Sequence, residues 1–182
     1  MKIIGISGRK QSGKNTVANI LHGVVLKENG LVLDFNIGPS GELLVLTTNA
    51  NNEEGWGELD ITRKDSDFLQ YAEYNMWPYI KLYSFADTLK WLCTDLFDIP
   101  YECIWGSNER RNEKQEHLHW EKMPGHITTH HGYGAMTARE FMQFLGTDIC
   151  RKIDTDIWMR NTLNRIKSEK SKLAVIADVR FV

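Results

Sequence analysis

"GRKQSGKNT", residues 8–16, separates two apolar segments of different periodicity, and the fold prediction starts from it. The segment before it, "KIIGIS" at residues 2–7, is rich in β-branched residues and predicts a strand buried on both faces. The segment after it, residues 14–28, predicts an amphipathic helix. Its apolar residues recur at three- and four-residue spacings: Val17, Ile20, Leu21, Val24 and Val25. The sequence therefore predicts a strand, a glycine-rich turn and a helix.

The turn itself fits the pattern G-x-x-x-x-G-K from Gly8 to Lys14. Glycines let backbone N–H groups converge on phosphate oxygens, and a helix N-terminus adds a favourable dipole. Lys14 would supply a positive charge to the terminal phosphates. We therefore expect a phosphate-binding loop, and the alternative is an ordinary glycine-rich connection.

The residue after the lysine departs from the usual pattern, in which a Ser or Thr hydroxyl ligates Mg²⁺. Here Asn15 follows Lys14, and the hydroxyl comes one place later at Thr16. The Asn15 amide oxygen could act directly or through a metal-bound water. The sequence therefore predicts phosphate binding, with Asn15 and Thr16 as the candidate metal contacts.

Two further strands are predicted along the chain. "YIKLYSF" at residues 79–85 precedes a helical pattern at 86–99, and "LAVIADV" at 173–179 ends in Asp178. Alternation of strands and helices favours a parallel sheet and an α/β fold. Asp178 is a candidate magnesium-site or catalytic acid, although an Asp at a strand end is commonly a turn or cap residue. Arg180 would contact a phosphate or form a surface salt bridge.

The segments between these units carry weaker signals. Residues 31–47 predict a β-hairpin, and the polar stretch 48–58 predicts an exposed loop, so we expect an insertion at about 31–65. Residues 67–77 predict a helix. "TARE" at 137–140 is a capping box that should start a helix, and residues 154–170 predict another. The segment from Pro100 to Tyr133 has no clear periodicity.

Polar residues on the capped helix form one candidate site. Arg139, Gln143 and Thr147 recur every four residues and would share one face, which suits binding of a phosphate and a base edge or a plain solvated surface. A zinc site is a competing interpretation, because many potential ligands occur nearby, although their spacing matches no known structural-zinc pattern. These residues are Cys103, His117, His119, His126, His130 and His131.

The bulk composition limits the class of protein. The chain has 182 residues and a formal net charge of -2, which predicts one domain and no general affinity for nucleic acid. Three widely spaced cysteines favour a reducing, cytoplasmic compartment. No stretch approaches the roughly 20 apolar residues of a membrane span. Whether the chain forms a homodimer stays open.

Four segments together resemble the phage-type deoxynucleoside monophosphate kinases, a branch of the P-loop nucleoside monophosphate kinase fold. They are "GRKQSGKNTVANIL", "YSFADTLKWL", "TAREFMQFLGTDICRKIDTDIWMRN" and "IADVRF". The first is generic to P-loop kinases, whereas the third is the specific one. The resemblance implies a three-layer sandwich, cytoplasmic localisation (the host cytoplasm if viral) and Mg²⁺-assisted phosphoryl transfer from ATP to a deoxynucleoside 5′-monophosphate.

The resemblance also implies roles for individual residues. The ATP phosphates would be held by Gln11, Ser12, Gly13, Lys14, Asn15 and Thr16, with metal contacts from Asn15, Thr16 and Asp178. The deoxynucleotide would be held by Lys10, Ala86, Asp87, Lys90, Arg139, Gln143, Gly146, Thr147 and Trp158. The catalytic set would be Lys10, Lys14, Arg139 and Asp178.

One departure from the family pattern concerns the number of strands. Kinases of this fold have about five parallel strands and an arginine-bearing lid, whereas only three core strands are found here. We expect the final strands and lid to be missing through truncation, to be reduced, or to come from another chain. The alternatives are another small P-loop kinase that acts on a non-nucleotide alcohol, and a nucleotide-binding fragment without catalysis.

Overall fold

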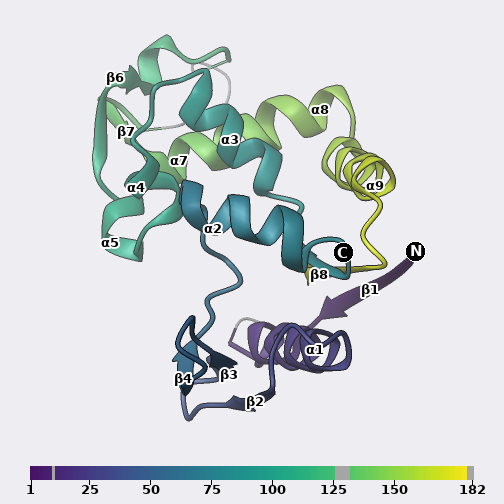
Figure 1. Ribbon diagram of the computed structural model, residues 1–182. Helices are drawn as coiled ribbons and strands as arrows, with labels where there is room; N and C mark the ends of the chain where they lie inside the picture. Colours follow the sequence, from purple (N-terminus) through teal and green to yellow (C-terminus); the bar gives the residue numbers. More distant parts are fainter. Residues whose placement is uncertain (10, 126–131, 180–182) are drawn as a thin grey trace. The chain divides into compact units, whose positions relative to one another are not determined.

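The computed structural model describes residues 1–9, 11–125 and 132–179. The chain divides into two compact units (Figure 1). The first comprises Met1–Phe85 and Thr162–Val182, and the second comprises Ala86–Asn161. No helix in the described ranges has the length and apolar character needed to cross a membrane.

The first unit is built on a three-stranded parallel sheet. Its strands are β1 (Lys2–Ser7), β5 (Ile80–Tyr83) and β8 (Leu173–Val179), in the order β1-β8-β5. β8 pairs on one side with β1, where Ser7 lies opposite Val179, and on the other side with β5, where Tyr83 lies opposite Ile176. The three predicted strands and their parallel direction are confirmed. Their carboxyl ends therefore lie at one edge of the sheet.

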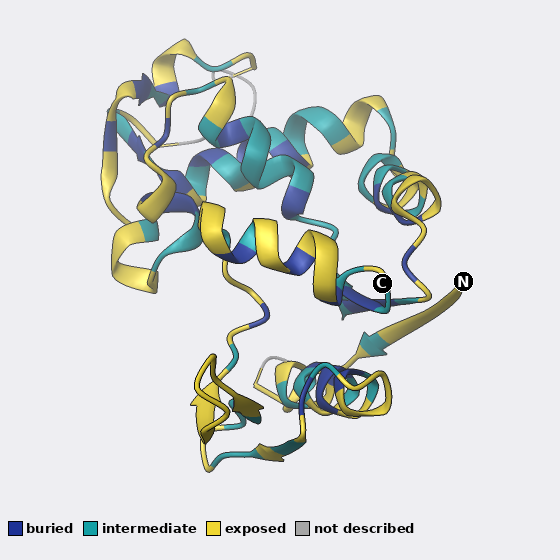
Figure 2. Cartoon of the chain, viewed as in Figure 1, coloured by how far each residue is buried: buried dark blue, intermediate teal, exposed yellow. Residues whose placement is uncertain are grey.

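Helix α1 (Lys14–Glu28) has the predicted bounds but a different buried face. The residues buried at four-residue intervals are Ala18, His22 and Leu26. Five apolar residues of α1 were expected on its buried face. Leu21 and Val25 do pack against the core cluster, but the prediction of burial is wrong for the other three. Those are Val17, Ile20 and Val24, which are 43, 40 and 37 % exposed. Figure 2 shows this mixed pattern along α1.

A second sheet follows α1 in the sequence and is antiparallel. It consists of β2 (Asp34–Ile37), β3 (Leu43–Thr48) and β4 (Glu54–Glu58), in that order. The predicted hairpin is confirmed as β2 and β3. The loop expected at 48–58 is confirmed as an exposed turn at 49–53, but the expectation is wrong for 54–58, because β4 pairs with β3 through Leu46–Trp56 and Thr48–Glu54. Glycine and glutamate have low strand propensity, so the ladder with β3 and not the local sequence defines β4.

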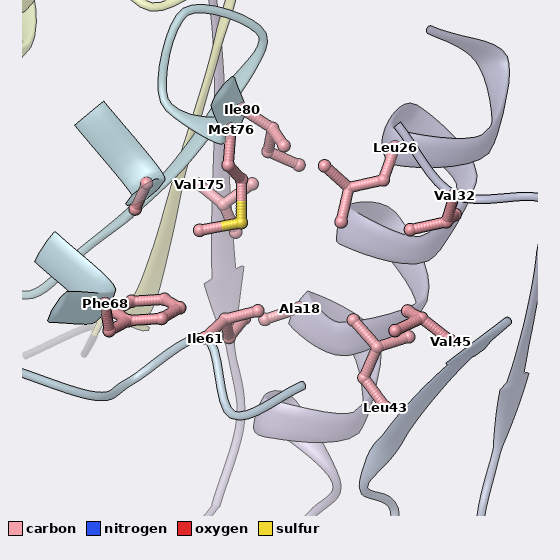
Figure 3. Close-up of a cluster of buried hydrophobic side chains, with 11 residues drawn as sticks. Ala18, Leu26, Val32, Leu43, Val45, Ile61, Phe68, Met76, Ile80 and Val175 are labelled. Carbon is pink, nitrogen blue, oxygen red and sulfur yellow. The ribbon is translucent and has the colours of Figure 1, made fainter. Parts of the chain in front are cut away.

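This antiparallel sheet packs on α1 through a close contact that needs glycine. A Cβ atom at Gly23 would lie 2.2 Å from the ring of Phe35, so only glycine lets β2 approach the helix this closely. The core around the contact combines α1, the antiparallel sheet and the parallel sheet (Figure 3). It includes Ala18, Leu26, Val32, Leu43, Val45, Ile61, Phe68, Met76, Ile80 and Val175.

The chain enters β5 through a helix that the sequence predicted. α2 (Ser66–Tyr71) continues into η1 (Ala72–Met76), a π-helical turn, and the two cover most of the expected range 67–77. The side chain of Asp65 caps α2 by accepting a hydrogen bond from the Phe68 backbone N–H at 3.1 Å. This cap fixes where the helix starts.

The second unit is mainly helical, with one small sheet. In chain order it contains α3 (Asp87–Asp95), α4 (Tyr101–Trp105), α5 (Asn108–Arg111), β6 (Lys114–His119), η2 (Trp120–Lys122), β7 (Ala135–Thr137), α7 (Ala138–Gln143), η3 (Phe144–Cys150), α8 (Arg151–Ile153) and the start of α9 (Ile157–Glu169). β6 and β7 pair antiparallel. The segment without sequence periodicity thus forms several short elements around a core that includes Ile104, Met136 and Phe141.

The predicted capping box at the start of α7 is confirmed, because both of its reciprocal hydrogen bonds are present. The Glu140 backbone N–H donates to Thr137 Oγ1 at 3.1 Å, and the Thr137 backbone N–H donates to Glu140 Oε2 at 2.7 Å. The helical path then continues through η3 and α8, over the range expected from the sequence. The part that the sequence did not predict is the π-helical geometry of η3.

His22 makes the stability of the first unit sensitive to acid. The ring is fully buried, with Nδ1 2.8 Å from the Ala18 carbonyl oxygen, and burial lowers the pKa of His22 from 6.5 to about 4. Between these values the unfolded chain binds the proton and the folded chain does not. The free energy of unfolding should therefore fall as the pH falls through this window, by up to about 3 kcal/mol.

Urea unfolding at pH 7 and pH 4.5 of the wild type and of His22→Met tests this. Met keeps a buried apolar side chain without a titrating group, so the variant should lose less stability on acidification than the wild type. Subtracting the stability loss of the variant from that of the wild type removes the contribution of the carboxyl groups that both proteins share. Equal losses in the two proteins would rule out His22 as the cause.

Candidate active site

The glycine-rich connection between β1 and α1 forms a tight loop. Gly13 has a φ of 79°, which glycine adopts without strain, and Gln11 also has a positive φ of 61°. The Ser12 backbone N–H donates to the Arg9 carbonyl at 3.2 Å. A Cβ atom at Gly8 would lie 2.5 Å from Ser12 Oγ, so the two sides of the loop nearly touch. Lys10 lies outside the described residues.

The side chain of Lys14 folds back across this loop. Its ammonium group donates to the carbonyl oxygens of Gly8, at 3.0 Å, and Arg9, at 2.6 Å. An ammonium group has three donors, so a third remains for an anion. The sequence predicted that Lys14 supplies a positive charge at the loop. The structure shows that Lys14 also closes the loop by bonding to its carbonyl groups.

The start of α1 is suited to an anion. Gly13 precedes the helix and has no side chain to cap it, and the first turn contains no acidic residue. The first N–H groups of an α-helix have no partners within the helix, and the helix dipole favours negative charge there. The loop, the helix start and Lys14 therefore direct backbone donors and a cation to one place.

The two candidate metal-binding residues after Lys14 differ in their surroundings. Asn15 is exposed, whereas Thr16 is half-buried. Thr16 Oγ1 lies so close to Gly41 that a Cβ atom at Gly41 would be 2.3 Å from it. Thr16 is therefore packed against the turn between β2 and β3.

Asp178 lies at the same edge of the parallel sheet as the loop. It precedes Val179, which pairs with Ser7, the last residue of β1 before the loop. Its carboxylate accepts a hydrogen bond from Ser84 Oγ at 2.6 Å and from the Phe85 backbone N–H at 3.1 and 3.2 Å to its two oxygens. Asp178 therefore joins the ends of β8 and β5. Our sequence reasoning missed Ser84, although a serine at the end of an apolar strand is a usable signal.

The donor atoms at this edge fit a magnesium ion of the kind held mainly by substrate phosphates. Such ions use one or two carboxylates, phosphate oxygens and waters, and not a cage of protein ligands. Asp178 supplies one carboxylate with lone pairs left over, and Asn15 supplies an amide oxygen. Among residues 1–9, 11–125 and 132–179, no group of three or more His, Cys, Asp or Glu side chains could hold a metal.

The second unit holds most residues expected around the acceptor. Ala86 precedes α3, Asp87 is buried in its first turn, and Lys90 follows one turn later. The Lys90 ammonium lies 4.3 Å from the centre of the Trp105 ring, a cation–π contact that holds the charge in place. The contact of Lys90 with Trp105 was not predicted from the sequence.

Arg139 is oriented by two asparagines at the ends of α5. Its Nε donates to Asn112 Oδ1 at 3.1 Å, and its Nη2 donates to Asn108 Oδ1 at 2.9 Å. Arg139, Gln143 and Thr147 are all exposed, as expected for a shared polar face. The sequence did not predict the two asparagines, because they are distant from Arg139 along the chain.

The π-helical segment η3 brings together Gly146 and Trp158. The Trp158 indole N–H donates to the Gly146 carbonyl at 3.1 Å. Gly146 itself is buried, and a Cβ atom there would lie 2.6 Å from Leu89 Cδ2. Gly146 therefore sets the packing of α3 on η3 and anchors Trp158.

The residues of the competing zinc interpretation have other partners where the structure describes them. His117 Nε2 lies 2.7 Å from the Phe97 carbonyl oxygen, and His119 Nε2 lies 3.1 Å from that of Glu116. Cys103 Sγ lies 3.6 Å from Glu113 Oε2. His126, His130, His131 and Arg180 lie outside the described residues.

The bond between Ser84 and Asp178 should contribute measurably to stability. Ser84→Ala removes a hydrogen bond to a carboxylate, and we expect the free energy of unfolding to fall by about 1 to 2 kcal/mol. The matched control is Ser168→Ala, which removes an exposed hydroxyl that donates to the Arg165 carbonyl at 2.9 Å. Chemical unfolding should show little change for the control. Equal effects would show that the contact with Asp178 adds nothing.

A family model described as deoxynucleotide monophosphate kinase matches residues 2–182. Neither the curated proteins nor the solved structures gave a match.

Proposed function

The chain belongs to the deoxynucleotide monophosphate kinase family, and from this premise we propose that it transfers the γ-phosphoryl group of ATP to the 5′-phosphate of a deoxynucleoside monophosphate. The products are ADP and a deoxynucleoside diphosphate. The observation that carries the proposal is the loop at residues 8–16, closed by Lys14 and next to Asp178 at one edge of the parallel sheet.

On the donor side, the loop N–H groups and the first turn of α1 bind the ATP phosphates. Lys14 exchanges its bonds to the Gly8 and Arg9 carbonyls for bonds to phosphate oxygens, which are stronger because both partners are charged. The exchange costs little reorganisation, since the ammonium group already lies across the loop. Gln11, Ser12 and Gly13 contribute the backbone of the loop.

The proposed magnesium ion would be held by Asn15, Asp178 and the phosphates, with Thr16 as an outer contact. When bound, it would neutralise charge on the phosphate oxygens. Ser84 and the Phe85 backbone N–H keep the Asp178 carboxylate fixed at the sheet edge.

On the acceptor side, the residues of the second unit bind the deoxynucleotide. Arg139, held by Asn108 and Asn112, contacts the acceptor phosphate, and Lys90 adds a second cation. The side chains that we propose around the sugar and base are those of Ala86, Asp87, Gln143, Thr147 and Trp158. Lys10, within the phosphate loop, is proposed to contact the acceptor phosphate as well.

The reaction needs positioning and charge neutralisation more than acid–base chemistry. The acceptor is a phosphate oxygen that is already anionic, so no general base has to remove a proton from it. Two anionic groups must instead be held in line despite their repulsion, and cations must stabilise the charge of the transferring group. Lys14, Lys10 and Arg139 are the side chains proposed for this task.

An ATP-consumption assay with dAMP, dCMP, dGMP and dTMP tests the proposal. We expect turnover with at least one of them, and a fall of about 10²- to 10³-fold in kcat for Lys14→Ala, which removes a cation from the transferring phosphates. The control Lys167→Ala changes an exposed lysine on α9 and should leave the rate unchanged.

Two results would contradict the proposal. One is the absence of turnover with all four deoxynucleotides while ATP is still bound, which would favour a nucleotide-binding protein without catalysis. The other is equal activity of Lys14→Ala and the wild type, which would remove the phosphate loop from the mechanism.

A further inference from the structure

The turn between β2 and β3, residues 38–41, contacts the first turns of α1. The Asn19 side-chain amide donates to the Gly41 carbonyl at 2.7 Å. Gly41 has a φ of 87°, and a Cβ atom on it would lie 2.3 Å from Thr16 Oγ1. Glycine is therefore required at this position for both its conformation and its closeness to Thr16.

The turn is held rigidly by its own hydrogen bonds. The Gly41 backbone N–H donates to the Gly38 carbonyl at 2.9 Å, and the Gly38 N–H donates to the Glu42 carbonyl at 3.0 Å. The Glu42 carboxylate accepts a further bond from the Ser40 backbone N–H at 2.8 Å. A turn with this many internal bonds presents a fixed surface to the helix.

The rest of the antiparallel sheet fixes the turn in position along α1. Phe35 packs directly on Gly23, and Lys27 forms an ion pair with Asp34 at 2.7 Å. The sheet thus contacts α1 near residues 16, 19, 23 and 27, which lie on one face at three- and four-residue spacings. The contacts at Gly23 and Lys27, towards the end of α1, therefore determine where the turn at residues 38–41 contacts the beginning of α1.

The beginning of α1 is the part that needs outside support. Its N-cap residue, Gly13, has no side chain to cap it, and its first turn, from Lys14 to Val17, carries no acidic residue. A side-chain cap would compete with an anion for the same N–H groups, so a phosphate-binding helix start cannot use one without loss of affinity. The contact of Gly41 with Thr16 and Asn19 on the helix flank supports the first turn of α1 without occupying those N–H groups.

We propose that the turn at residues 38–41 is a positioning element of the donor site, which fixes Thr16 and the first turn of α1 before ATP binds. Asn19 and Gly41 are the positioning residues. This inference rests on the proposed function only for the identity of the ligand. Loss of the contact should weaken ATP binding, because the ligand must then order the loop itself, and should leave the KM for the deoxynucleotide unchanged.

Asn19→Ala provides the first test, with Asn29→Ala as its matched control. Both asparagines lie on α1 or at its end, and each donates a 2.7 Å amide hydrogen bond to a backbone carbonyl, that of Gly41 and that of Val25 respectively. Titration calorimetry with a non-hydrolysable ATP analogue and Mg²⁺ gives the readout. Asn19→Ala should weaken binding about three- to tenfold, as for the loss of one hydrogen bond, and Asn29→Ala less than twofold.

Gly41→Ala and Gly30→Ala form a second pair that separates contact from backbone strain. Both glycines have a positive φ, 87° and 70°, so both variants are strained. Only at Gly41 does the added methyl group meet Thr16, because a Cβ atom at Gly30 has nothing within 4 Å. Gly41→Ala should weaken binding of the analogue at least tenfold, and Gly30→Ala should bind it like the wild type.

The inference is wrong if Asn19→Ala binds the analogue as tightly as Asn29→Ala does, or if neither the wild type nor any variant binds it. If Gly41→Ala does not fold, the comparison of Asn19→Ala with Asn29→Ala tests the inference without it. Failure of the proposed function looks different: the variants would then differ in analogue binding as expected, while the wild type turned over none of the four deoxynucleotides.

Discussion

Parallel pairing of β8 between β1 and β5 is the constraint on which the rest of the first unit depends. Because the three strands run in the same direction, their carboxyl ends meet at one edge, as in other open α/β sheets that bind ligands there. The candidate phosphate loop follows β1, Ser84 follows β5, and Asp178 is the residue before the last in β8. The bonds from Ser84 and the Phe85 N–H to Asp178 then fix two of these ends together.

Helix α1 serves two purposes, and this explains why its buried face differs from the predicted one. Its start forms part of the candidate phosphate site, while its flank supports the antiparallel sheet. Close packing on that flank requires a small residue, so Gly23 is buried beneath the ring of Phe35. Val17, Ile20 and Val24 are exposed.

The parts of the structure that the sequence predicted are those encoded by neighbouring residues. The three core strands, the bounds of α1 and the capping box of Thr137 and Glu140 all follow from local patterns. The parts that it missed depend on distant partners. β4 exists because β3 pairs with it, and the asparagines around Arg139 come from α5. The π-helical geometry of η3 likewise has no signal in the spacing of its apolar residues.

The proposed function depends on binding of the ATP phosphates by the backbone of the loop at residues 8–16. Hydrogen–deuterium exchange with and without a non-hydrolysable ATP analogue and Mg²⁺ tests it directly, because bound backbone N–H groups exchange more slowly. We expect slower exchange in peptides that cover residues 8–19, and none of this protection in Lys14→Ala at the same analogue concentration. Unchanged exchange in those peptides, with the analogue bound and protection elsewhere, would contradict it.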